Sequence, residues 1–253
     1  MGTASVSFGQ NLIQNGNFSS MSPNSTNGKG LDAPGYSGGV TLTSWSNSGY
    51  NFVFAGTNKG DTSINGSSGS FSLWGPNTGS NNGLVRPPGS TNFIAADGAF
   101  EVGPLTQVVS GLTAGKTYAV SFDWAGAQQS GFNGTTQESW SVALGGAGFT
   151  AGPNDESGTL AGAQTTATVT NASHGFTGWM SQTFNFTAAS SSETLYFLAN
   201  GTPTGQPPFS LLANVSMTAV PEASTYWTIV LAMLIMVGTR VWRGYQKKSV
   251  ANA

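Results

Sequence analysis

The chain has 253 residues, of which only 7% are charged, with 36 glycines and no cysteine. The lack of cysteine excludes disulfide bonds and thiol chemistry, and a formal net charge of −2 excludes the basic footprint of a nucleic-acid-binding protein. Many glycines beside 15 Phe and 7 Trp indicate a folded all-β domain with short strands and many turns, rather than a disordered chain.

The N-terminal residues 1–10 contain neither a basic nor an apolar stretch, so they do not form a complete signal peptide. We expect a leader remnant or a disordered N-terminus there, with the true start of the protein upstream. One domain then covers residues 11–219. Its first predicted strand, Asn11–Phe18, contains an Asn-Gly turn signal at Asn15-Gly16. This opening resembles that of galactose-binding-like jelly rolls.

Alternating apolar and polar residues, bounded by turn residues, predict further short strands along the domain. They cover residues 40–45, 50–55, 71–74, 93–96, 105–109, 117–124, 140–144, 166–170, 179–187, 194–199 and 211–219. One buried face is expected from Tyr118, Val120, Phe122 and Trp124, and another from Leu211, Ala213, Val215, Met217 and Ala219. About ten strands without a helical period predict an antiparallel β-sandwich of jelly-roll type. The run Leu112–Phe122 also resembles a hairpin corner of carbohydrate-binding jelly rolls.

The C-terminal segment differs from the rest of the chain. An uncharged apolar run, Tyr226–Thr239, is followed by a cluster of positive charges at Arg240, Arg243, Lys247 and Lys248. The run is short for a membrane span, because its helix covers roughly 21 Å against about 30 Å of hydrocarbon. Interfacial aromatic residues and a snorkelling Arg240 extend it. We therefore expect a transmembrane helix at 226–242 and a basic cytoplasmic tail at 243–253, with the domain outside.

Residues 220–225 precede this helix and complete a pattern. The sorting box consists of Val220, Pro221, Glu222, Ala223, Ser224 and Thr225. Box, helix and basic end resemble the PEP-CTERM sorting signal, with Ala223 where that family carries a second proline. The resemblance implies processing by an exosortase-type enzyme in the bacterial membrane, with the four basic residues as the retention signal. Landmarks such as Trp74-Gly75-Pro76 and Ala96-Asp97-Gly98 also resemble a recurring PEP-CTERM ectodomain.

Candidate binding residues are few. Any of Trp45, Trp74, Trp124, Trp140 and Trp179 could stack on a sugar ring or belong to the core. Trp74 and Trp179 are the better sugar candidates, because glycines flank them at loop edges. Asp97 and Glu101 are candidates for a structural calcium ion.

Catalytic residues are not evident in the sequence. His174 is the single histidine and has no second ligand or nucleophile at a suitable spacing. Hydrolase, zinc-protease and P-loop motifs are absent. We expect a non-catalytic, membrane-tethered envelope or extracellular-matrix protein. Its partners would be lipid and an exosortase-type enzyme, and it would reach the cell surface after processing. The alternatives are a carbohydrate-binding module acting on extracellular polysaccharide, an ice-binding protein or a glycoside hydrolase.

Overall fold

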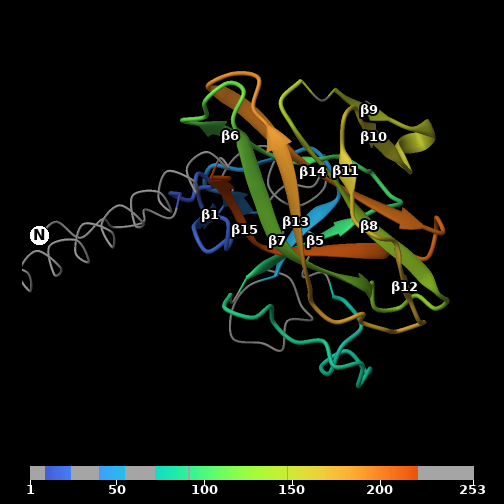
Figure 1. Cartoon of the computed structure of the whole chain (residues 1–253). Helices are drawn as coiled ribbons and strands as arrows, with labels where there is room; N and C mark the ends of the chain where they lie inside the picture. Colours follow the sequence, from blue (N-terminus) through green and yellow to red (C-terminus); the bar gives the residue numbers. More distant parts are fainter. Residues whose placement is uncertain (1–8, 24–39, 55–71, 91, 147, 222–253) are drawn as a thin grey trace, which may run out of the picture. The chain divides into compact units, whose positions relative to one another are not determined.

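The computed structural model describes residues 9–23, 40–54, 72–90, 92–146 and 148–221 (Figure 1). It divides into two compact units, Met1–Thr218 and Ala219–Ala253. Within the described residues, no helix is both long enough and apolar enough to span a membrane. Residues 1–8, the box from Glu222 to Thr225, the predicted helix at 226–242 and the basic residues of the tail lie outside the described residues.

Two antiparallel sheets form the domain, and Figure 1 labels most of their strands. A six-stranded sheet follows the order β11-β8-β14-β6-β3, with β12 also pairing β8. Its strands are β3 (Ser46–Asn47), β6 (Leu105–Ser110), β8 (Thr136–Leu144), β11 (Gln164–Thr165), β12 (Val169–Asn171) and β14 (Ser192–Thr202). A five-stranded sheet follows the order β13-β7-β15-β5-β4. Its strands are β4 (Asn51–Phe54), β5 (Phe93–Asp97), β7 (Thr117–Gln128), β13 (Met180–Thr187) and β15 (Pro208–Ala219). From β5 to β8, and again from β13 to β15, successive strands alternate between the two sheets.

Two small pairs complete the described structure. They are β1 (Met21–Pro23) with β2 (Val40–Leu42), and β9 (Phe149–Ala151) with β10 (Gly158–Leu160). A short 3-10 turn, η1 (Pro153–Asp155), connects β9 to β10. The predicted all-β class with antiparallel sheets is confirmed.

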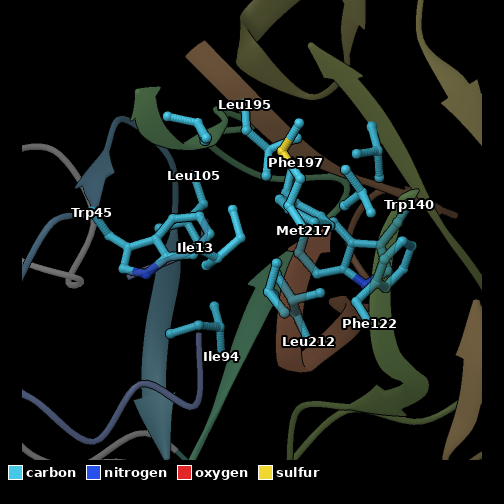
Figure 2. Close-up of a cluster of buried hydrophobic side chains, with 14 of the residues drawn as sticks. Ile13, Trp45, Ile94, Leu105, Phe122, Trp140, Leu195, Phe197, Leu212 and Met217 are labelled. Carbon is cyan, nitrogen blue, oxygen red and sulfur yellow. The ribbon is translucent and has the colours of Figure 1, made fainter. Parts of the chain in front are cut away.

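The main core contains side chains from both sheets. On β7, the alternate residues Tyr118, Val120, Phe122 and Trp124 are all buried, as predicted. They share this core with Trp140 of β8 and with Phe197 of β14. The Phe122 and Phe197 rings meet edge to face, with centroids 5.2 Å apart. Figure 2 shows this core, with Trp140, Phe122 and Phe197 among the labelled side chains.

A second apolar cluster consists of the residues that β4, β5, β7 and β15 turn away from the main core. It contains Phe52, Phe54, Leu73, Leu84, Phe93, Ala95, Ala125, Ala127, Phe209, Leu211 and Ala213. Leu73 and Leu84 come from the segment between β4 and β5 and are fully buried. The outer face of the five-stranded sheet is therefore partly covered, and this cover leads to the candidate site.

The strand expected at 166–170 is only β12, and the described residues of 71–74 form isolated bridges rather than a strand. Two further corrections concern the core. Asn11–Phe18 is not a strand, although Ile13 and Phe18 are buried in the main core. The segment lies beside β15, where Leu12 donates from its backbone nitrogen to the Met217 carbonyl at 2.9 Å. A side chain at Gly16 would collide with the Val215 carbonyl, so only glycine permits this close approach.

The second correction concerns β15, which does not keep one face. Leu211 and Ala213 lie in the second cluster, whereas Val215 and Met217 lie in the main core. Asn214 between them has a left-handed backbone, with φ of 52°. Such a residue is typical of a β-bulge, which shifts the alternation by one residue.

Candidate functional site

A pocket of about 390 Å³ lies where several strands of the five-stranded sheet begin or end. Three loops form it together with Tyr50, which directly precedes β4: the loop after β5, the loop after β7 and the loop between β14 and β15. They meet because Asp97 at the end of β5 pairs with Phe209 near the start of β15. In addition, Gln129 donates from its backbone nitrogen to the Pro207 carbonyl at 3.4 Å. The lining residues are Tyr50, Asp97, Ala99, Phe100, Gln129, Phe132, Thr204, Gly205 and Pro207.

Aromatic side chains dominate the apolar part of this lining. Phe100 is 46% exposed and Phe132 is 36% exposed, although both are large hydrophobic residues. Tyr50 meets the edge of Phe100, with ring centroids 5.1 Å apart and planes at 88°. The Tyr50 backbone is fixed on both sides, since its nitrogen donates to the Glu101 carbonyl at 2.9 Å and its carbonyl accepts from the Asp97 nitrogen at 3.0 Å. The rings are therefore presented to solvent from a rigid frame.

Among the described lining residues, Asp97 is the one that carries a carboxylate. Its side chain is only 2% exposed, and one carboxylate oxygen accepts from the Ala99 backbone nitrogen at 2.8 Å. Burial raises the pKa of Asp97 to about 7, and the backbone N–H groups of Ala99 and Phe100 only partly offset this. Near neutral pH this group can therefore accept or donate a hydrogen bond.

Glu101 follows on the same loop but does not line the pocket. Burial, and then the negative charge of Asp155, raise the pKa of its carboxyl above the ordinary value. No group of three or more His, Asp and Glu side chains is arranged to hold a metal ion in the part of the chain that the structure describes. Calcium at Asp97 and Glu101 stays a prediction.

Trp74 contacts the loop that carries Phe132. Its indole nitrogen donates to the Phe132 carbonyl at 2.7 Å. His174 stacks on the indole, with centroids 4.0 Å apart and planes at 29°, and its Nε2 lies 2.6 Å from the Asn133 side-chain oxygen. Both residues therefore fix the loop. Sugar stacking by Trp74 itself stays a prediction.

Trp179, the other predicted sugar-stacking residue, lies apart from this lining. Its indole nitrogen donates to the Val85 carbonyl at 2.9 Å. Its ring contacts Phe93 edge to face, at 5.5 Å between centroids. It is half-buried against the second apolar cluster, and sugar stacking there also stays a prediction. The remaining candidates Trp45, Trp124 and Trp140 are buried in the main core, so they are core aromatics rather than sugar-stacking residues.

The sequence prediction missed Phe100, Phe132, Gln129 and Thr204 as site residues. A signal was present for two of them, because Phe100 and Phe132 each stand in a loop rich in glycine, away from any apolar alternation. An isolated aromatic residue in such a loop has no strand face to pack on. What the sequence does not show is that the two loops meet.

Comparison with known proteins gives no family assignment. No protein family and no curated protein matches the chain. Among solved structures, a CBM4 domain is 16% identical, covering 82% of this chain and 99% of that domain, with a TM-score of 0.36. A CBM61 domain in complex with β-1,4-galactotriose is 11% identical, covering 83% and 99%, with a TM-score of 0.37. The CBM22-1 xylan-binding domain of Xyn10C from Paenibacillus barcinonensis is 10% identical, covering 87% and 100%, with a TM-score of 0.37. At these values, the matches assign neither a family nor a ligand.

Proposed function

We propose that the β-sandwich is a carbohydrate-binding domain and that a glycan occupies the pocket between Phe100 and Phe132. The proposal rests on the exposure of these two rings and on the hydrogen bond from Trp74 that holds the loop of Phe132. The C–H face of a pyranose ring is apolar and packs on an aromatic ring, while its hydroxyl groups need hydrogen-bond partners. Pockets for small ligands combine an apolar lining with a few such polar groups.

The polar groups of the pocket can form hydrogen bonds with the hydroxyl groups of a sugar. Asp97, Gln129 and Thr204 line it together with the aromatic residues. A neutral carboxyl, an amide and a hydroxyl each both donate and accept hydrogen bonds. A sugar hydroxyl has the same dual character, so each of these groups can pair with it.

We propose further that the domain is not catalytic. Glycoside hydrolases generally use two carboxyl groups that flank the scissile bond. In the part of the pocket lining that the structure describes, Asp97 is the single carboxyl group, which favours binding without turnover. Assaying polysaccharide substrates for released reducing ends tests this, and turnover that Asp97→Asn abolishes would contradict it.

Glycan-array binding of the full-length chain, purified in detergent, tests the proposed ligand class. We expect signal on a subset of glycans, and we expect Phe100→Ala and Phe132→Ala each to weaken binding by about three- to tenfold, which corresponds to the loss of one ring contact. Both rings are exposed, so the fold should survive their removal. Val108→Ala is the matched control, because Val108 is 65% exposed on β6 and does not line the pocket. A silent array, or two Phe variants that bind like the control, would refute the proposal.

For the C-terminal segment we propose the sorting role that its resemblance implies. The support is the order of box, apolar run and basic cluster at 220–248. The protein would be held in a bacterial membrane with the domain outside, and an exosortase-type enzyme would then process it. Pro221→Ala with Glu222→Ala should leave an unprocessed, membrane-bound product in an exosortase-containing host. Unchanged processing of this variant would contradict the role of the box.

A further inference from the structure

We infer that the pocket selects glycans that carry an ammonium group, and that Asp97 is the residue that recognises it. The ligand class is therefore amino sugars with a free amine. The inference rests on the proposed function, because it concerns the same pocket, and it adds the chemical feature by which one glycan would be preferred over another.

The charge of the lining is the first argument. Among the described residues that line the pocket, Asp97 carries the one ionisable carboxyl group, and none is a lysine or an arginine. An ionised carboxylate that is nearly buried, without a cation beside it, loses hydration that only a partner charge or strong hydrogen bonds can replace. Asp97 is 2% exposed and lines the pocket. A ligand ammonium group would supply the missing cation.

The aromatic rings give the second argument. Tyr50 and Phe100 meet edge to face beside Asp97, and Phe132 lines the same pocket. Aromatic faces attract cations and also pack on neutral sugar rings. The rings alone therefore do not distinguish an amino sugar from a neutral sugar, and the carboxyl group of Asp97 must do so.

The surroundings add a third argument. Glu101 lies on the loop of Phe100, and the charge of Asp155 contributes to the raised pKa of its carboxyl. One side-chain oxygen of Glu101 is buried and has no hydrogen-bond partner among the described residues. Negative charge close to a pocket whose described lining contains no basic residue attracts a cationic ligand and repels uronic acids or sulfated sugars.

A matched set of β-1,4-linked tetrasaccharides tests this inference, because its members differ only at C2. Glucosamine carries an amine there, N-acetylglucosamine an amide and glucose a hydroxyl. Isothermal titration of the full-length chain near pH 6.5 should show about tenfold tighter binding of the glucosamine tetramer, the gain expected for one charged hydrogen bond. Asp97→Asn should remove this preference. Glu193→Gln is the control, because Glu193 is a carboxylate on β14 that accepts from the Ala189 backbone nitrogen outside the pocket.

The outcomes separate the inference from the function. Equal affinities for the three tetramers, all lowered by Phe100→Ala, would overturn the amino-sugar preference and leave carbohydrate binding in place. Absence of binding by any tetramer, together with a silent glycan array, would overturn both. If Asp97→Asn does not fold, the ¹³C signal of the Asp97 carboxyl group in the unmodified chain decides. The glucosamine tetramer must then lower the pKa of Asp97 while the glucose tetramer does not, and equal responses would refute the inference.

Discussion

A carboxyl group inside the sandwich makes the stability of this protein depend on pH. Glu138 on β8 is completely buried and lies among residues that face the main core, two positions before Trp140. One of its oxygens accepts a hydrogen bond from the Thr136 hydroxyl. The other is buried and has no hydrogen-bond partner among the described residues. Burial therefore raises the pKa of Glu138 from 4.5 to about 8, and the Thr136 hydroxyl only partly offsets this.

The sign of the effect follows from proton binding. The unfolded chain releases the Glu138 proton near pH 4.5, whereas the folded protein keeps it until about pH 8. The contribution to stability is therefore complete below pH 4.5 and is lost progressively as the pH rises to about 8. At roughly 1.4 kcal/mol per pKa unit, the total change is on the order of 5 kcal/mol. This is comparable with the whole free energy of unfolding of many domains.

Glu138→Gln isolates this effect, because glutamine has nearly the same shape and never ionises. At acid pH we expect the free energy of unfolding of the variant to lie within about 1 kcal/mol of that of the unmodified protein. Near pH 8 we expect it to be at least 2 kcal/mol higher. Urea unfolding of the full-length chain, followed by tryptophan fluorescence across this range, measures both. Asp97 titrates in the same range, but it does so in both proteins and cancels in the difference. Glu156→Gln, a change in the turn between β9 and β10, is the control. A difference between Glu138→Gln and the unmodified protein that does not vary with pH would refute the reasoning.

Three further predictions concern packing and the pocket. Gly126→Ala should lower the free energy of unfolding by about 1–3 kcal/mol in the same urea assay. The added Cβ would lie 2.7 Å from the Glu138 oxygen that has no partner among the described residues. Unchanged stability would show that the Glu138 side chain can move aside. Phe197→Ala should cost about 3–5 kcal/mol, since Phe197 is fully buried between the sheets, and a cost below 1 kcal/mol would contradict that position. Trp74→Phe should weaken glycan binding a few-fold on the array without lowering thermal stability by more than a few degrees, because it removes the hydrogen bond to the Phe132 carbonyl; an unaltered array signal would exclude a positioning role.

The alternation of apolar and polar residues predicts a strand where one face of the strand is buried and the other is more exposed. β7 is such a strand over its first eight residues, where one face meets the core and the other is half-buried. Beyond Trp124 the pattern ends, because Ala125, Gly126 and Ala127 are all buried. Because the residues on both faces are small and buried there, the sequence shows no alternation. The predicted strand therefore ends at Trp124, four residues before β7 ends at Gln128.

The pocket was out of reach for a related reason. Its residues lie near positions 50, 97–100, 129–132 and 204–207, in segments that are brought together by the pairing of β4, β5, β7 and β15. Periodicity describes neighbours along one strand and not the loops that the topology brings together. The presence of a tryptophan also did not identify the sugar-stacking residues, because large aromatic residues most often fill the core. Trp45, Trp124 and Trp140 do so here.

The change of face at Asn214 connects the fold to the proposed site. Before it, β15 contributes Leu211 and Ala213 to the second cluster, and after it Val215 and Met217 to the main core. The Asn214 side chain holds this change of face, since its amide donates to the Pro88 carbonyl at 2.7 Å and to Asp123 at 2.8 Å. It thereby attaches the end of the covering segment to the sheet.

Because of this change of face, one end of the five-stranded sheet is apolar on both sides and must be covered. The cover reaches from Leu73 to Leu84, and the apolar surface continues through Phe52 and Phe209 to Tyr50. Phe100, which contacts Tyr50 and lines the pocket, is 46% exposed. Among the described residues, the pocket is thus a partly exposed continuation of the second core, which explains why it presents aromatic rings to solvent. A glycan ring bound there, as proposed, would pack on these rings.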